Sequence, residues 1–342
     1  MTVFDVLRSY QTGLSVSEVE RTAIANLGLR TRIRFNLPFH ALGFRNYDII
    51  HINYAFYGIP ALICNQLAQI PFVETVHGIP QPELEKGLDE LGYFAEQWAM
   101  PLTSRRASLV VSDSNYIREE LRRRFDVRSI TIPLGVDTTR FFPSTDDEAI
   151  AARRRLAIRE GDRVVVYVGR LHPWKDPFTL VRAASLVLKE RKDVTFCLVG
   201  RGPLLGDIVR LTRILGIQDR VIVTAHPDYY HGLTDYYKAA DVFVLPTKKE
   251  GFGLVVLEAM ASGLCVIASD GGAPRELLND SGLLFKTGDH DSLSGTILNV
   301  LSDNTTRRKL GIAARARAVG MFTWEKCAQS YLRLYKQILG GS

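Results

Sequence analysis

The sequence has no run of apolar residues long enough to cross a bilayer, which takes roughly 20 consecutive residues. The start, MTVFDVLRSY, lacks the basic flank and apolar core of a secretory signal. The 4 cysteines are far apart, so they do not suggest a metal cluster. We therefore expect a cytoplasmic protein with reduced thiols, without a bound metal, and neither secreted nor membrane-spanning.

The sequence also has little excess of charge of one sign, since the net charge is +6. A small positive net charge is compatible with binding to nucleic acid, anionic lipid or a phosphorylated substrate, and equally with a solvated surface that binds none of them. The densest basic run, Arg122 to Arg124, follows Glu119 and Glu120 in IREELRRRF. That pattern indicates an exposed helix with internal ion pairs. We expect no nucleic-acid partner, and keep peripheral contact with a membrane as an alternative.

The chain has 342 residues, 46% of them hydrophobic, which favours two globular domains. From about residue 160, short apolar runs alternate with helical periods. The predicted strands there are 164–168, 195–199, 221–225, 241–245, 265–269 and 283–285. Near-continuous apolar strands separated by helices are typical of a parallel sheet covered on both faces. This half is predicted to be a doubly wound α/β domain.

The first half repeats the pattern less cleanly, with predicted strands at 2–7, 31–35, 48–53, 72–77, 109–113 and 129–134. Between the halves, GVDTTRFFPSTDDEA has the composition of a linker. We predict an N-terminal domain at 1–143, a C-terminal domain at 144–322 and a final helix at 323–342. Two such sheets leave a cleft between them, and ligands of open α/β sheets bind beyond the carboxyl ends of the strands.

One strand-to-helix loop, in KKEGFGLVVLEAMASG, has features of an anion site. Gly251 and Gly253 allow close backbone approach, and the helix that we expect to begin near Leu254 offers free amides to a phosphate. Glu258 lies one turn inside that otherwise apolar helix. A buried carboxylate needs hydrogen-bond donors. Ribose hydroxyls are one candidate, and donors from the protein itself are another.

A second loop, GRLHPWKD, follows the first strand of the C-terminal domain and carries Arg170 and Lys175. Asp176 and Pro177 suit the start of the next helix. Two cations at the ligand edge fit a diphosphate, although basic loop residues are often only solvated. A third loop, LVGRGPLLG, departs from the dinucleotide fingerprint in its spacing, so a dehydrogenase is a weak alternative.

These loops, with the E-x7-E spacing from Glu250 to Glu258, resemble the retaining GT-B glycosyltransferases of the family 4 type. The likeness covers most of the chain. It includes the segments YVGRLHPWKD, LVGRGP, AADVFVLPTKKEGFGLVVLEAMASGLCVIASDGGAPREL, TVHG, IPLGVDTTRFFP and FTWEKCAQSYLRLYKQIL. It implies two Rossmann-like domains facing a central cleft, with the last helix returning to the first domain.

The resemblance also implies roles for residues at matching positions. Glu258 would bind the ribose of a nucleotide-diphosphate sugar, and Glu250 the hydroxyls of its sugar. Arg170 and Lys175 would stabilise the diphosphate leaving group, and His77, in TVHG, would reach the donor sugar.

The amides of Phe252, Gly253 and Leu254 would lie near the donor. Members often carry paired glycines after the first strand. Here the loop SYQTGLSVSEVER holds only Gly13, which we assign to the donor site.

The resemblance predicts transfer of the sugar to an acceptor hydroxyl by same-face attack assisted by the leaving phosphate, without a cofactor or metal. The acceptor would be a glycan, a lipid-linked sugar or a small molecule. A sugar phosphorylase or a nucleotide-sugar epimerase on the same fold are alternatives, as is a binding protein without catalysis. Tyr93, Phe94 and Trp98 are candidates for contact with a lipid-linked acceptor, although such spacing also suits a core.

Overall fold

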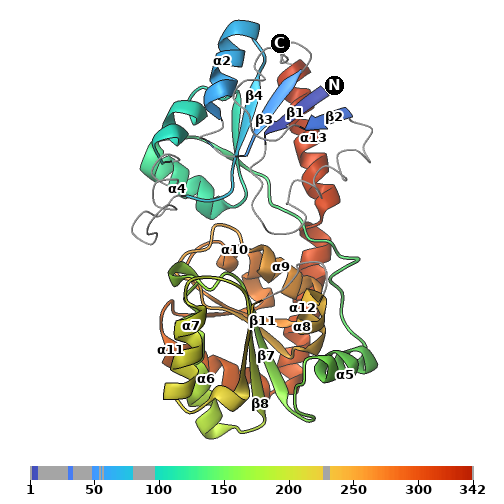
Figure 1. Ribbon diagram of the computed structural model, residues 1–342. Helices are drawn as coiled ribbons and strands as arrows, with labels where there is room; N and C mark the ends of the chain where they lie inside the picture. Colours follow the sequence, from blue (N-terminus) through green and yellow to red (C-terminus); the bar gives the residue numbers. More distant parts are fainter. Residues whose placement is uncertain are drawn as a thin grey trace. The chain divides into compact units, whose positions relative to one another are not determined.

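The computed structural model describes residues 2–6, 30–33, 48–53, 55, 58–79, 97–225 and 232–340. The chain divides into two compact units (Figure 1). Unit 1 comprises Met1–Gly135 and Trp324–Ser342, and unit 2 comprises Val136–Thr323. Each unit contains a 6-stranded parallel sheet with helices, which confirms the predicted α/β class with two parallel-sheet domains.

In unit 2 the strand order is β12-β11-β10-β7-β8-β9. The strands are β7 (Arg163–Val168), β8 (Val194–Val199), β9 (Val221–Thr224), β10 (Val242–Leu245), β11 (Cys265–Ser269) and β12 (Leu283–Phe285). Every residue of β8 and β11 is buried, as a parallel sheet covered on both faces requires. Within these two strands, burial raises the pKa of the Cys197 and Cys265 thiols to about 12, so both act as small apolar residues.

Helices cover both faces of this sheet. They are α5 (Asp146–Arg155), α6 (Pro177–Glu190), α7 (Leu205–Ile214), α8 (Leu233–Ala239), α9 (Leu254–Ala261), α10 (Pro274–Leu278), α11 (His290–Ser302) and α12 (Asn304–Met321). Short 3-10 turns are η4 (Pro173–Lys175), η5 (Gln218–Arg220) and η6 (Asn279–Ser281). α6, α7 and α11 lie on one face, and α8, α9 and α12 on the other (Figure 1). From β7 the sheet grows in one direction through β8 and β9 and in the other through β10, β11 and β12, and parallel crossovers of one hand that run in opposite directions place their helices on opposite faces.

Unit 1 has the strand order β2-β1-β3-β4-β5-β6. Its described elements are β1 (Thr2–Val6), β2 (Arg30–Ile33), β3 (Ile49–Ile52), α2 (Gly58–Ala68), β4 (Phe72–Val76), β5 (Leu109–Ser112), α4 (Asn115–Phe125), β6 (Ile130–Thr131) and α13 (Trp324–Gly340). The division between the units falls after Gly135, whereas the sequence pattern places it near Pro143. The reason is that Val136 pairs with the end of unit 2, where its N–H donates to the Phe322 carbonyl at 2.9 Å.

Buried polar side chains attach α13 to the unit 1 sheet. The Tyr335 hydroxyl lies 2.7 Å from His51 Nδ1, and Thr75 Oγ1 lies 2.7 Å from His51 Nε2. Thr75 Oγ1 is also 2.9 Å from the Tyr331 hydroxyl. Burial, aided by the charge of His77, lowers the pKa of His51 to about 3. His51 is therefore neutral at physiological pH and bonds through both ring nitrogens.

Acidification is expected to destabilise the protein through His51. The unfolded chain binds a proton at His51 below a pKa of about 6.5, whereas the folded chain stays neutral down to about 3. Stability present above pH 6.5 is therefore lost as the pH falls through that window. Between pH 7 and 5 the loss from this group is about 2 kcal/mol. Urea unfolding of wild type and His51→Gln at pH 7 and 5 tests this, because the free energy of unfolding should fall less in the variant than in wild type. Equal losses would contradict it.

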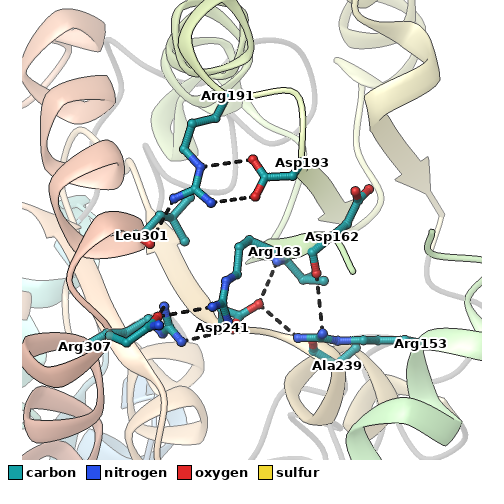
Figure 2. A network of polar contacts seen from close by, with 11 residues as sticks. Arg153, Asp162, Arg163, Arg191, Asp193, Ala239, Asp241, Leu301 and Arg307 are labelled. Atoms are coloured by element: carbon teal, nitrogen blue, oxygen red, sulfur yellow. Dashed lines mark hydrogen bonds and ion pairs between the residues drawn. The ribbon is translucent and has the colours of Figure 1, made fainter. Parts of the chain in front are cut away.

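A network of arginines surrounds Asp241 in unit 2 (Figure 2). The Asp241 carboxylate accepts from Arg153 at 2.9 Å, Arg163 at 3.0 Å and the Val164 N–H at 2.9 Å, and Arg307 lies 3.4 Å away. Arg163 begins β7 and Asp241 precedes β10, so the network lies at the amino ends of the strands. It joins α5, β7 and α12. These three arginines therefore contact a carboxylate of the protein itself, and they lie at the strand ends opposite the predicted ligand edge.

Candidate active site

The loops at the carboxyl ends of β7 and β10 come together in unit 2. Arg170 follows β7, and Glu250 lies between β10 and α9. The Lys248 N–H donates to the Trp174 carbonyl at 2.9 Å and joins the two loops. Because carboxyl ends of parallel strands share one edge of the sheet, the residues predicted from separate motifs form one cluster there.

Lys175 and Glu250 form a buried ion pair in this cluster. Lys175 ends η4 and is 9% exposed, and Glu250 is 7% exposed. The Lys175 ammonium contacts the Glu250 carboxylate directly. Removing charges from water is unfavourable, and the fold tolerates it here because each partner neutralises the other. The pair therefore places two buried charged groups at the ligand edge of the sheet.

Arg170 is exposed beside this pair, and its guanidinium is held by an aromatic ring. Its Cζ lies 4.7 Å from the centroid of the Trp174 ring, and the Lys175 ammonium lies 4.4 Å from the same centroid. The buried Tyr167 hydroxyl donates to the Arg170 carbonyl at 2.8 Å. Burial, and then the charge of Glu250, raise the pKa of Tyr167 above its ordinary value, so this hydroxyl stays a donor. Two cations, Arg170 and Lys175, thus lie close to one aromatic ring at the ligand edge.

The backbone of Glu250 is fixed by the loop after β11. The Glu250 N–H donates to the Gly271 carbonyl at 3.0 Å, and the Ala273 N–H donates to the Glu250 carbonyl at 2.9 Å. Gly272 has a φ of 108°, and a Cβ there would lie 2.3 Å from the Glu250 carbonyl oxygen. Only glycine fits this approach. Sequence reasoning gave Gly272 no role, although the GG pair in DGGAP signalled a tight turn.

The helix α9 begins at Leu254, as predicted. Gly253 precedes it in the left-handed conformation, with φ 104° and ψ 61°, and no side chain in the described part of the chain caps the helix. Phe252, in the loop before α9, is buried at 4% exposure. The first amides of α9 can therefore bind an anion, which the helix dipole also favours.

Glu258 is buried within α9 at 4% exposure and has a donor from the protein. The Tyr237 hydroxyl of α8 donates to Glu258 Oε2 at 2.6 Å. The Tyr237 ring stacks on Phe243 at 6.0 Å and meets Phe141 edge-on at 5.4 Å. Sequence reasoning missed Tyr237, since no motif links it to Glu258. Glu258 is thus a buried carboxylate with a tyrosine donor from a neighbouring helix of unit 2.

His77 lies in unit 1, in a row of polar residues at the ends of three strands. Its Nδ1 is 2.8 Å from Asp113 Oδ2, and its Nε2 is 2.9 Å from Asn53 Oδ1. Asn53 follows directly after β3, His77 after β4 and Asp113 after β5. Asp113 is 1% exposed and orients the imidazole. Asn53 and Asp113 were not predicted, although their position after a strand was a usable signal.

Other predicted residues fall elsewhere. Gly13, Tyr93 and Phe94 lie outside the described residues. Trp98 is 66% exposed in a helix at 97–104 of unit 1, so it is not a core residue.

Neither a metal cluster nor a membrane helix is found within the described ranges. No group of three or more His, Cys, Asp or Glu side chains among these residues could hold a metal ion. None of the helices described has both the length and the apolar character needed to span a bilayer.

Two family models match the chain. Residues 148–317 match the glycosyl transferases group 1 model, and residues 7–140 match the glycosyltransferase family 4 model. A D-inositol 3-phosphate glycosyltransferase of Nocardia farcinica is 30% identical over 312 residues, which cover 86% of this chain and 67% of that protein. The chain thus spans about two thirds of the length of this curated relative.

Solved structures share the fold. A sucrose-phosphate synthase from Thermosynechococcus elongatus has a TM-score of 0.85 at 23% identity, with 100% of both chains covered. HepE from Anabaena, in complex with UDP-glucose, has a TM-score of 0.81 at 21% identity, covering 98% of this chain and 100% of that one.

Proposed function

Because the chain belongs to the glycosyl transferases group 1 family, we propose that it transfers a sugar from a nucleotide-diphosphate sugar to an acceptor hydroxyl. The observation that carries this proposal is the buried Lys175–Glu250 pair beside the exposed Arg170 at the carboxyl edge of the unit 2 sheet. A cation pair with a neighbouring carboxylate suits a molecule with phosphates at one end and hydroxyls at the other. The UDP-glucose bound to HepE is such a molecule.

In this proposal the residues of unit 2 bind the donor. Arg170 and Lys175 bind the diphosphate, together with the first amides of α9. Glu250 accepts hydrogen bonds from hydroxyls of the sugar, and Glu258 from the ribose. Tyr237 orients the Glu258 carboxylate for this contact by donating to its Oε2. His77, which the family resemblance predicts to reach the donor sugar, belongs to unit 1, where Asp113 orients its imidazole.

The proposed reaction is retaining and needs no metal. The bond between the anomeric carbon and the phosphate oxygen breaks, and the acceptor oxygen bonds to that carbon from the same face. The acceptor proton passes to the departing phosphate oxygen. Negative charge grows on the diphosphate during this step, so Arg170, Lys175 and the α9 amides stabilise the transition state more than the bound donor.

The acceptor is proposed to carry a free hydroxyl and to belong to the class of glycans, lipid-linked sugars or small polyols. The Nocardia relative is named for an inositol phosphate, which supports a small polyol as one member of this class.

A donor screen tests the function. Thermal shift with nucleotide sugars that differ in base and sugar identifies the best stabiliser, since a ligand that binds the native state raises the melting temperature. The same donor should then yield a glycosylated acceptor with a retained anomeric configuration, at an unchanged rate in EDTA. Release of a sugar phosphate that depends on added phosphate would indicate a phosphorylase. A rearranged sugar nucleotide would indicate an epimerase, and binding without any product would indicate a non-catalytic protein.

Glu258→Ala is expected to weaken binding of the nucleoside diphosphate about tenfold or more, which corresponds to at least about 1.4 kcal/mol. The reason is the loss of an acceptor for the ribose in a buried site. Tyr237→Phe should weaken binding less, because it removes only the group that orients the carboxylate. Calorimetric titration measures both. Glu190→Ala, an exposed glutamate at the end of α6, is the control. Unchanged affinity in Glu258→Ala would refute the ribose contact.

A further inference from the structure

Trp174 contacts both cations of the candidate active site. Its ring centroid lies 4.7 Å from Arg170 Cζ and 4.4 Å from Lys175 Nζ. The His172 ring meets it at 6.1 Å and 65°, which restricts how the indole can turn. A cation within about 6 Å of an aromatic face is attracted to it, most strongly by tryptophan. One indole ring therefore contacts both cations.

The backbone of Trp174 joins the same cluster to the Glu250 loop. Its carbonyl accepts from the Lys248 N–H at 2.9 Å and from the Thr247 hydroxyl at 3.1 Å. Thr247 and Lys248 lie two or three residues before Glu250 in the chain. The position of the indole is thus tied to the loop that carries the carboxylate partner of Lys175.

The indole of Trp174 also carries an N–H group, which takes no part in the contacts with the two cations. Trp174 Nε1 is buried and has no hydrogen-bond partner among the residues that the structure describes. A buried donor without an acceptor lowers stability. Phenylalanine would fill much of the same space without that donor, but its ring binds cations more weakly. The combination indicates that the aromatic face, and not the N–H, is the functional part of Trp174.

We infer that Trp174 is a positioning residue, which holds Arg170 and Lys175 at the spacing needed to bind one diphosphate group. This inference rests on the proposed glycosyl transfer. A long arginine side chain in solvent adopts many rotamers, and ordering it upon binding is unfavourable. The indole orders Arg170 in advance, so both cations meet the charge that grows on the leaving diphosphate without rearrangement.

The test compares Trp174→Phe and Trp174→Leu in the full chain. With the donor found by the thermal-shift screen, we expect kcat to fall in the order Trp, Phe, Leu, by about tenfold for Leu, with a smaller change in KM. The melting temperature of Trp174→Phe should be equal to or above that of wild type, because the unpaired N–H is gone. Trp324→Phe, a buried tryptophan of α13, is the matched control and should leave kcat unchanged.

A second readout does not depend on activity. In wild type, NMR of the Arg170 side chain should show an upfield ring-current shift, which disappears in Trp174→Leu. Equal kcat in wild type and Trp174→Leu would overturn the inference. It would also be overturned if Trp174→Phe and Trp174→Leu lost kcat equally and both had lowered melting temperatures. Failure of the proposed function is distinguishable, because wild type itself would then transfer no sugar while the ring-current shift persists.

Discussion

Lys175→Ala is expected to lower the rate of sugar transfer by about a thousandfold. The ammonium is proposed to stabilise the charge that develops on the leaving diphosphate, and no solvent cation can replace it at a site that is 9% exposed. The substitution also leaves the Glu250 carboxylate buried without its ion-pair partner, next to the proposed position of the phosphate. Single-turnover kinetics with saturating donor measure the chemical step. Lys189→Ala, an exposed lysine of α6, is the control and should keep full activity.

A double variant separates catalysis from folding at this pair. A buried charge that has lost its partner destabilises a protein by about 3–5 kcal/mol. Adding Glu250→Gln to Lys175→Ala removes that unpaired charge, so stability should recover while transfer stays low. Full activity in Lys175→Ala, or recovery of transfer together with stability in the double variant, would refute the role of Lys175.

The strands of unit 2 could be predicted from sequence because they are buried on both faces. The ranges 265–269 and 283–285 coincide with β11 and β12, and the others agree within one residue. Nearly uninterrupted apolar residues leave few alternatives to a covered parallel sheet. The start of α9 at Leu254 was predictable for a similar local reason, since Gly253 and the apolar run after it mark the boundary.

The partners of the site residues were not predictable in the same way. Tyr237 meets Glu258 from another helix, and Glu250 meets Lys175 across 75 positions of sequence. Such contacts depend on how elements pack, and no periodic pattern encodes them. The E-x7-E spacing predicts a role for both carboxylates, whereas their different partners, an ammonium and a phenol, emerged only from the fold. Asp113 beside His77 is a further case.

The proposed division of labour between the two glutamates follows from those partners. Glu250 is paired with the Lys175 ammonium at the end of η4, the same cation that is proposed to bind the diphosphate. Glu258 lies within α9 and accepts from the Tyr237 hydroxyl, and because a carboxylate oxygen can accept from more than one donor, this setting suits the proposed hydrogen bonds from a ribose. The two acids therefore suit different parts of one donor.

Gly272→Ala is expected to lower transfer about a hundredfold, although residue 272 bears no reactive group. The added Cβ would lie 2.3 Å from the Glu250 carbonyl oxygen and 2.8 Å from its nitrogen, so the Glu250 backbone must move. The φ of 108° adds strain for any residue with a side chain, of about 1–3 kcal/mol. Melting temperature and kcat are the measurements, and both should fall.

Gly295→Ala is the matched control, because it makes the same chemical change in a different setting. Gly295 lies exposed in α11, and a Cβ there would have no neighbour within 4 Å among the described residues. Alanine favours a helix by about 1 kcal/mol over glycine, so this variant should be slightly more stable and fully active. If Gly272→Ala kept wild-type kcat, the position of the Glu250 backbone could not matter for transfer. If both variants lost activity alike, the loss would come from added methyl groups in general and not from the contact between the two loops.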